Sequence, residues 1–443
     1  MSVDELFDML KEQDLPYLKD WLSAQPPHAI ADELIRVDAA GMALVFRLLD
    51  KGKALAVFEE LDPSDQQEIL AGLRDRAFSE LVEGMDPDDR ARLIGELPAK
   101  VARRVLAGLS PHERQMTAAL LGYPEGSVGR MMTPEVVAIH RNLTVAEALD
   151  VVRTKGANAE TVYTLPVVDD GRRLVGIASL RDLVTADTGR RVDGLAEKEY
   201  VSARATDDAE AAARLMRDAN LLDLPIVDSE DRLLGFLTID DAVEVIEAAD
   251  TEDAYRQSGS EPLAGSYLLV SIRQLASRRA PWLLLLFVAA ILTINVLDFF
   301  EENLAEVTAL ALFIPMITGA GGNTGAQSAT SVVRALALSD VRIRDLPRVL
   351  WREARVGAIL GVVLATIGIG IGTIFADFDL AIVIAISLLA VCTWAAIVGG
   401  SMPLLAKKLK IDPAVVSAPM VATLVDATGL IIYFLTARAI LGI

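Results

Sequence analysis

The hydrophobic pattern divides the chain into a mixed first part and an apolar last part. Residues 282–297 read WLLLLFVAAILTINVL, without a charge. Further long apolar runs lie at about 305–333, 356–376, 380–406 and 413–437. A run of roughly 20 apolar residues can cross a hydrocarbon core about 30 Å thick. The pattern therefore predicts an all-α transmembrane domain with five helices over residues 281–443.

Charged loops predict how these helices are oriented. Basic clusters lie at 273–279, 334–355 and 407–410, which all fall on one side of the predicted membrane. The opposite loops carry acids, at 298–302 and 377–379. Because basic loops stay in the cytoplasm, we expect a multi-pass protein of the cell (inner) membrane, with the amino terminus cytoplasmic and the carboxyl terminus outside. The alternative for one of the runs is a re-entrant helix.

The second span is polar for a membrane helix. Residues 313–330 read FIPMITGAGGNTGAQSAT, which combines Pro315 with four glycines, amides and hydroxyls. Proline removes a backbone donor, and glycines let the backbone loosen or let a neighbouring helix approach closely. We expect this broken segment to lie in the protein interior or along a water-filled path. A packing seam of small residues is the alternative.

The fifth span contains one acid, Asp426, in SAPMVATLVDATGLIIYF. A charge at membrane depth costs about 2.5–3.5 kcal/mol, so it needs a cavity, a proton or a cation. Hard divalent ions such as Mg²⁺ take oxygen ligands and keep several waters. The alternative is a structural aspartate bonded to hydroxyls such as Thr423.

The polar part contains an internal repeat. LPVVDDGRRLVGIASLRDLV begins at Leu165 and LPIVDSEDRLLGFLTIDDAV begins at Leu224, and nine of their twenty positions are identical. Each predicts a strand, an acidic turn, a second strand and a helix start. This unit resembles a tandem pair of α/β CBS domains, over 130–190 and 195–248. In that family the motif Gly-x-x-Ser/Thr-x-x-Asp, here Gly176–Asp182 and Gly235–Asp241, often contacts an adenosine nucleotide such as ATP. The resemblance therefore implies nucleotide contacts at Ser179, Asp182, Thr238 and Asp241. Helix capping alone is the alternative.

Upstream, proline recurs every 24 residues, at Pro63, Pro87 and Pro111, each after Asp or Ser. An N-cap followed by proline marks a helix start. Residues 1–123 are therefore predicted to be an all-α helical-repeat domain. We expect the apolar faces of its helices to be formed by Leu70, Leu73, Leu81, Ile94, Leu97, Val101 and Leu106. Residues 249–280 are predicted to connect this part to the membrane through an acidic helix, which could equally be an ordinary solvated one.

The distribution of charge indicates which class of ligand the protein binds. The net charge is −20, and residues 271–443 hold 13 basic and 11 acidic residues, so almost all of the excess acid precedes the spans. Such a domain repels phosphates and attracts cations, which disfavours nucleic acid and favours divalent ions. Three scattered histidines and the absence of GxSxG, HExxH and GxxxxGK[ST] argue against an enzyme.

The order of helical repeats, paired CBS domains, acidic connector and five spans, with GGNTG in the second and Asp in the fifth, resembles the MgtE family of magnesium channels. The resemblance implies a homodimer in the lipid bilayer that moves Mg²⁺ down its electrochemical gradient. Its pore lies along the two-fold axis between the second and fifth spans, and the implied pore ligands are Asp426, Thr330 and Asn323. The family also implies closure by cytosolic Mg²⁺ between acidic domains, at positions equivalent to Glu210, Asp241, Glu244, Glu252, Asp253, Asp88 and Asp89.

Three positions depart from the family pattern. Ala326 and Ala418 stand where polar pore residues are expected, and Asn220 replaces a regulatory carboxylate. Selectivity among Mg²⁺, Mn²⁺ and Co²⁺ therefore stays open. A different class, a membrane-anchored cation or nucleotide sensor, is the remaining alternative, although an anchor needs neither the broken second span nor Asp426.

Overall fold

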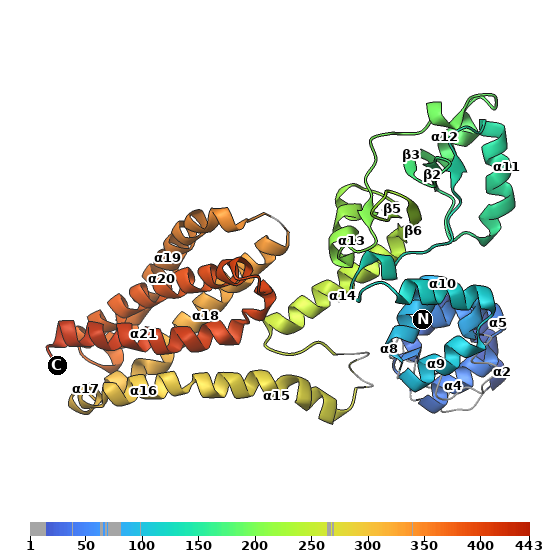
Figure 1. Ribbon diagram of the computed structural model, residues 1–443. Helices are drawn as coiled ribbons and strands as arrows, with labels where there is room; N and C mark the ends of the chain where they lie inside the picture. Colours follow the sequence, from blue (N-terminus) through green and yellow to red (C-terminus); the bar gives the residue numbers. More distant parts are fainter. Residues whose placement is uncertain are drawn as a thin grey trace. The chain divides into compact units, whose positions relative to one another are not determined.

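The computed structural model describes residues 15–37, 39–62, 65–66, 69, 81–97, 99–263, 267, 270–338 and 340–443. The chain forms two compact units (Figure 1). Unit 1 comprises 1–249 and 264–270, and unit 2 comprises 250–263 and 271–443.

Unit 1 begins with short helices around an apolar core. Leu18, Leu34, Phe58 and Ile94 are almost completely buried in it. The described helices are α2 (Leu15–Ala24), α3 (Pro27–Leu34), α4 (Ala39–Leu48), α5 (Lys51–Glu59), α8 (Pro87–Glu96), α9 (Ala99–Gly108) and α10 (Pro111–Leu121). The all-α prediction for this region is confirmed over the described residues.

Two of the three helix starts predicted from proline lie among the described residues, and both are confirmed. Pro87 and Pro111 open α8 and α10, and the Ser110 hydroxyl accepts a hydrogen bond from the Glu113 amide at 3.2 Å. Asp86 precedes Pro87, but its side chain makes no capping bond. The predicted start at Pro63, with Leu70 and Leu73, lies outside the described residues. Val101 was expected in the core, but it is 38% exposed.

The repeat folds as predicted into two similar sheets, with strand orders β1-β2-β3 and β4-β5-β6. In each sheet the first pair of strands is parallel and the second is antiparallel. The elements are β1 (Ile139–His140), α11 (Val145–Lys155), β2 (Thr164–Val168), β3 (Leu174–Ser179), α12 (Leu180–Thr185), β4 (Ala203–Arg204), α13 (Ala209–Asp218), β5 (Asp223–Val227), β6 (Leu233–Thr238) and α14 (Ile239–Gln257).

The two acidic turns of the repeat are built alike. The Asp169 carboxylate accepts hydrogen bonds from two amides of its own turn, and Asp228 does the same in the second sheet. Arg172 and Asp231 take left-handed backbone angles there, with φ of +59° and +61°. These local bonds close the two hairpins. The strands of the second hairpin therefore pair in the same register as those of the first.

The connecting segment is not one helix. α14 ends at Gln257, and Gly259 follows with φ of +73°. The next helix, α15, starts at Ile272, where Ser271 and Gln274 form a reciprocal capping box. The prediction of a connecting helix over 249–280 is therefore wrong in extent, since a left-handed glycine cannot continue a right-handed helix.

Unit 2 is helical. Its elements are α15 (Ile272–Ala289), α16 (Ile291–Phe299), α17 (Glu301–Glu306), α18 (Leu310–Ala337), α19 (Leu346–Phe375), α20 (Phe378–Lys408) and α21 (Ala418–Leu441). Among the described residues, four segments are long and apolar enough to cross a membrane: Ile272–Phe299, Ile343–Phe375, Phe378–Lys408 and Ala418–Leu441. α18 has 28 residues but is more polar, so the count of five spans stays a prediction.

α18 is continuous, although the sequence predicts a broken segment. It runs helically through Pro315 and all four glycines. A Cβ atom at Gly321 would lie 2.6 Å from a methyl carbon of Val391 on α20, and one at Gly325 would lie 3.0 Å from a methyl carbon of Val421 on α21. Gly321 and Gly325 therefore serve close helix packing rather than a break.

Candidate functional site

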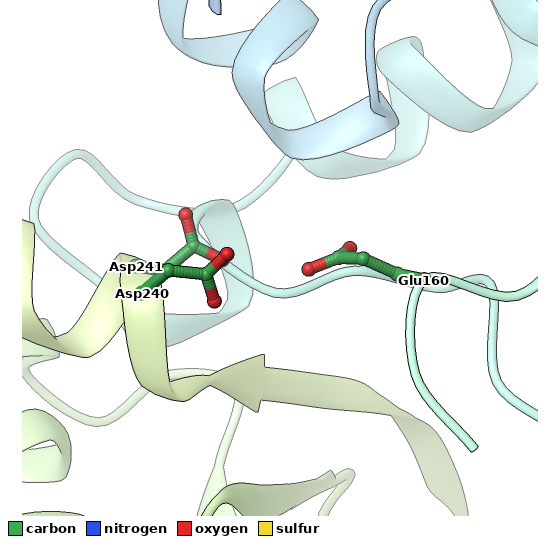
Figure 2. A group of neighbouring side chains, drawn as sticks. All are labelled: Glu160, Asp240 and Asp241. Atoms are coloured by element: carbon green, nitrogen blue, oxygen red, sulfur yellow. The ribbon is translucent and has the colours of Figure 1, made fainter. Parts of the chain in front are cut away.

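Three carboxylates of unit 1 meet at the start of α14. Asp240 and Asp241 lie in the first turn of α14, and Glu160 comes from the segment before β2 (Figure 2). Each offers one oxygen atom, and these oxygens all lie within 4.8 Å of one another. The Thr238 hydroxyl donates to Asp241 Oδ2 at 2.6 Å and orients that side chain. We call Glu160, Asp240 and Asp241, together with Asp88, Asp89 and Glu59, the acidic cluster.

Asp88, on α8, adds a buried carboxyl group to this cluster. Its side chain is only 5% exposed, and its Oδ1 is buried without a hydrogen-bond partner among the described residues. Burial raises the pKa of Asp88 well above its usual value, and Asp241 and Glu160 raise it further. A buried carboxylate oxygen without a donor is costly, so it indicates a position for a proton or a cation.

Asp89 is joined to α14 through an arginine. Arg92 Nη2 donates to Asp89 Oδ1 at 2.8 Å, and Arg92 Nη1 pairs with Glu244 Oε2. This guanidinium is a built-in positive charge at the edge of the cluster. It neutralises part of the repulsion between α8 and α14, but it does not reach the Oδ1 of Asp88, which keeps no hydrogen-bond partner.

The electrostatics of the cluster favour cation binding near neutral pH. Loss of water raises the pKa of Glu160 to about 7 and that of Asp241 to about 6, and neighbouring carboxylates add to both shifts. Burial likewise raises the pKa of Asp89 to about 7, against the attraction of Arg92. Glu59 is raised to about 7 by burial and then by Asp86. An all-carboxylate donor set suits a hard divalent ion such as Mg²⁺.

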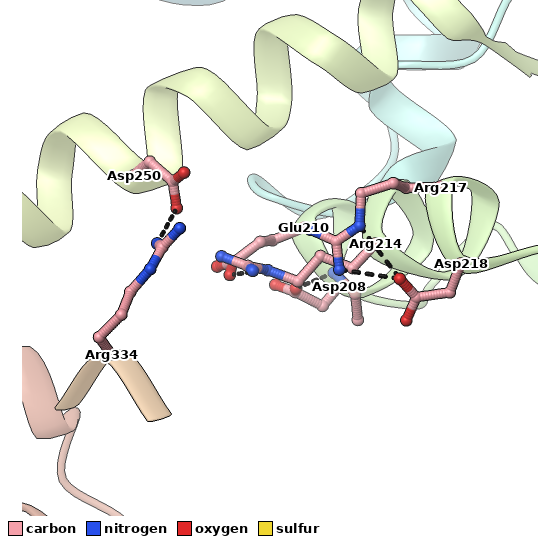
Figure 3. A network of polar contacts seen from close by, with 8 residues as sticks. Asp208, Glu210, Arg214, Arg217, Asp218, Asp250 and Arg334 are labelled. Carbon is pink, nitrogen blue, oxygen red and sulfur yellow. Dashed lines mark hydrogen bonds and ion pairs between the residues drawn. The ribbon is translucent and has the colours of Figure 1, made fainter. Parts of the chain in front are cut away.

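The remaining predicted regulatory residues lie elsewhere. Glu210 accepts a hydrogen bond from Arg214 on its own helix at 2.7 Å (Figure 3). Glu252 pairs with Arg256, which also pairs with Asp412 within unit 2. Asp253 lies on the same helix, α14. Asn220 has φ of +54°, a backbone that asparagine tolerates better than most residues. The structure thus gathers Asp88, Asp89, Asp241 and Glu244 in unit 1 but places Glu210 on α13, paired with Arg214 of the same helix.

The predicted nucleotide residues act as helix caps. Ser179 accepts a hydrogen bond from the Asp182 amide, and Asp182 accepts one from the Ser179 amide, which forms a reciprocal capping box at α12. Thr238 and Asp241 pair through their side chains at the start of α14. The capping alternative therefore has direct support, and nucleotide contact at these residues stays a prediction.

In unit 2, Asp426 lies beside the glycines of α18. A Cβ atom at Gly322 would stand 3.4 Å from Asp426 Oδ1, so glycine leaves room for the carboxylate. The Thr423 hydroxyl donates to the Pro419 carbonyl in its own helix, which does not support the structural alternative for Asp426. Asn323, Gln327 and Thr330 are exposed and follow at spacings of four and three residues, so they share one polar face of α18.

The cluster includes residues that sequence analysis missed. Glu160 has no motif and lies far from its partners in sequence. Asp240 precedes Asp241 in TIDDAV, and Glu59 ends α5. The doubled acid at 240–241 is a signal that the pattern contained, whereas nothing local marks Glu160.

The architecture defines a class of protein in which mixed α/β sheets precede a bundle of long apolar helices. Family comparisons match "MgtE intracellular N domain" to residues 25–126, "CBS domain" to 128–189 and 192–248, and "Divalent cation transporter" (MgtE) to 314–436. The chain is 41% identical over 330 residues to the magnesium transporter MgtE of Thermus thermophilus, which covers 74% of this chain and 73% of that protein.

Other relatives agree. The chain is 36% identical to the magnesium transporter MgtE of Enterococcus faecalis, over 71% of this chain and 69% of that protein. A crystal structure of the cytosolic domain of the Mg²⁺ channel MgtE in complex with ATP covers 55% of this chain and 100% of that chain, at 35% identity and a TM-score of 0.52. The chain belongs to the MgtE family.

Proposed function

We propose that this protein transports Mg²⁺ across the cell membrane, down its electrochemical gradient. The observation that carries the proposal is the polar face of α18 beside Asp426, set among helices that are otherwise apolar. Membership of the MgtE family, whose relatives include magnesium transporters, supports Mg²⁺ as the ion.

The conduction path is proposed to lie between two copies of this chain. Asn323, Gln327 and Thr330 are exposed in a single chain, and polar side chains on a membrane helix need protein or water to cover them. A homodimer that joins the α18 and α21 faces around a two-fold axis would cover them and bring two Asp426 carboxylates to one path. In this proposed arrangement each chain crosses the membrane five times, with its amino terminus in the cytoplasm and its carboxyl terminus outside.

The chemistry of the path suits a hydrated divalent ion. Mg²⁺ gives up its waters reluctantly, so carboxylates, amides and hydroxyls bind it through that shell. A negative interior drives entry by about 2.3 kcal/mol per charge per 100 mV, and a divalent ion gains twice this. The path therefore needs no nucleotide hydrolysis.

The acidic cluster is proposed as the regulatory site. Without a cation, the carboxylates of Asp88, Glu160 and Asp241 repel one another, so the helices that carry them tend to separate. Mg²⁺ between them converts repulsion into attraction. It can close the pore only if it binds the closed arrangement more tightly than the open one. Glu210, Glu252 and Asp253 are proposed to contribute further Mg²⁺ contacts.

ATP, or another adenosine nucleotide, is proposed as a ligand of the CBS pair. The support is the similar cytosolic domain that was crystallised with ATP. Ser179, Asp182, Thr238 and Asp241 are the candidate contacts. Calorimetric titration of ATP into the full-length protein tests this, with AMP in parallel and the Ser179→Ala variant as comparison. Equal heats for wild type and variant would remove Ser179 from the site.

Transport is tested by uptake into proteoliposomes that contain a Mg²⁺ indicator. Wild type should carry Mg²⁺, and Asp426→Ala should lose almost all of the flux. The matched control Asp379→Asn should keep it, because Asp379 is an exposed acid at the start of α20. Because Ala326 and Ala418 remove two polar groups, Mn²⁺ and Co²⁺ are measured in parallel. A faster flux of either ion would change the assigned substrate, and no flux of any divalent ion would favour a sensor.

A further inference from the structure

At the start of α19 the basic and acidic side chains lie on different faces of the helix. Arg348, Arg352 and Arg355 follow one another at spacings of four and three residues, and all three are exposed. Such spacings place side chains on one face of a helix. Glu353 is directed elsewhere, since the Ser328 hydroxyl of α18 donates to Glu353 Oε2 at 2.7 Å. The outward face therefore carries three guanidinium groups, and the nearby acid is turned inward.

Little on the protein neutralises this row. Arg348 lies 3.6 Å from Asp345 and stays 89% exposed. Among the described residues, neither Arg352 nor Arg355 has a carboxylate within ion-pair distance. The arginines therefore present an open positive surface.

The same face continues as an apolar surface. Ile359, Val362 and Val363 are 65%, 55% and 53% exposed. The opposite face is packed, because a Cβ atom at Gly357 would lie 2.6 Å from the Cys392 carbonyl oxygen and one at Gly361 would lie 2.7 Å from Leu389 Cα. α19 thus turns its glycines to α20 and its large apolar side chains outward, as expected for contact with lipid chains.

An aromatic ring lies within the arginine row of this face. Trp351 is 66% exposed, and the Arg355 guanidinium lies 5.7 Å from the centre of its ring. Arg355 Nε also donates to the Trp351 carbonyl at 3.3 Å. Tryptophan concentrates at membrane interfaces, and its ring holds a guanidinium in place there.

We propose that Arg348, Trp351, Arg352 and Arg355 bind the headgroups of anionic phospholipids, in the leaflet at the amino-terminal end of α19. Guanidinium groups bind phosphate oxygens in pairs, and basic juxtamembrane segments attract anionic lipids. Residues 348–355 rise about 10 Å along the helix, which is on the scale of the headgroup layer. The lipid chains would lie along Ile359, Val362 and Val363.

Native mass spectrometry of the full-length protein in detergent tests the proposal, with phosphatidylglycerol and phosphatidylcholine as the added lipids. The triple variant Arg348→Gln, Arg352→Gln, Arg355→Gln should lose affinity for phosphatidylglycerol by about fivefold for each arginine removed. Affinity for phosphatidylcholine should not change. The matched control replaces Lys407, Lys408 and Lys410 by Gln, which removes the same charge at the end of α20 and should keep the preference.

Each other result has a defined meaning. An equal loss in both triple variants would show attraction to overall charge and would overturn the site. Competition by millimolar inorganic phosphate would show a site for soluble anions and would also overturn it. A triple change to Lys keeps the charge and the fold but not the paired geometry, so it should bind between wild type and the Gln variant. Because binding is measured without transport, failure here leaves the proposed Mg²⁺ flux untouched.

Discussion

Two regions of the molecule offer oxygen atoms to a cation, and they differ in charge. In unit 1, three carboxylates approach within 4.8 Å of one another, and Asp88 adds a buried fourth. In unit 2, Asp426 stands near Gly322, and the exposed side chains of the neighbouring α18 face are neutral: Asn323, Gln327 and Thr330. The first region concentrates negative charge, and the second spreads one charge among amides and hydroxyls.

The difference fits the two proposed tasks. A conducting path must bind an ion well enough to admit it and weakly enough to release it. A regulatory site must instead distinguish two arrangements of the protein, and several carboxylates that repel one another without a cation give a large difference.

Asp426→Asn should remove conduction and leave regulation intact. The amide keeps the size of the side chain but loses the charge that attracts the ion, so Mg²⁺ flux should fall at least about a hundredfold. Mg²⁺ should still protect unit 1 from limited proteolysis as in wild type. Loss of both flux and protection would mean that the two regions do not act separately.

Asp241→Asn should have the converse effect. Removing one carboxylate weakens Mg²⁺ binding by the acidic cluster, so closure should need about tenfold more Mg²⁺ while flux at low Mg²⁺ persists. Asp182→Asn, measured like Asp241→Asn without nucleotide, is the matched control, since Asp182 is the equivalent residue of the first repeat and caps α12. If both variants shift the closing curve equally, the cluster is not the regulatory site.

The acidic cluster should make unit 1 sensitive to pH when divalent ions are absent. The folded arrangement raises the pKa of Glu59, Asp89 and Glu160 to about 7, so it binds more protons than the unfolded chain between about pH 4 and 7. Stability without Mg²⁺ should therefore fall as pH rises from about 4.5 to about 7, and it should level off at higher pH.

The expected size is a drop of roughly 5 °C in the melting temperature between about pH 5 and about pH 7 in EDTA, after allowance for solvent screening. Differential scanning fluorimetry of the full-length protein measures it. Millimolar Mg²⁺ should flatten the curve, because the cation replaces the protons. A Mg²⁺-free stability that rises with pH would contradict the assigned shifts.

Arg92→Gln should give the smallest change. Arg92 joins Asp89 to Glu244, so its loss leaves α8 and α14 more dependent on the cation. Resistance to proteolysis without Mg²⁺ should fall about twofold to fivefold, whereas resistance in saturating Mg²⁺ should stay near wild type. Arg153→Gln serves as control, because Arg153 pairs with Asp150 on its own exposed helix.

Much of the fold follows from local patterns. The repeats at Leu165 and Leu224 predict both hairpins, because the acidic turns are closed by bonds within a few residues. Pro87 and Pro111 predict two helix starts for the same local reason. The extent of the connecting helix was wrong, because the left-handed backbone at Gly259 is not visible in an amphipathic pattern.

Some residues of the candidate sites can also be predicted from the sequence, and others cannot. Asp426 is visible in the sequence because one acid among apolar residues breaks a pattern. Asp241 and Asp88 followed from resemblance to a family, and the structure adds that Asp88 is buried without a partner for its Oδ1. Glu160 could not be found, since no spacing relates it to Asp241, 81 positions later.

The helical first region, the paired sheets, the long apolar helices and the single acid of α21 can all be read from the order of neighbouring residues. Three features need the folded structure: the continuity of α18 through its glycines, the segments that bring carboxylates to the acidic cluster, and the face of α19 that carries its arginines outward. These features depend on close approach between distant segments, where excluded volume and the repulsion of like charges act through space rather than along the chain.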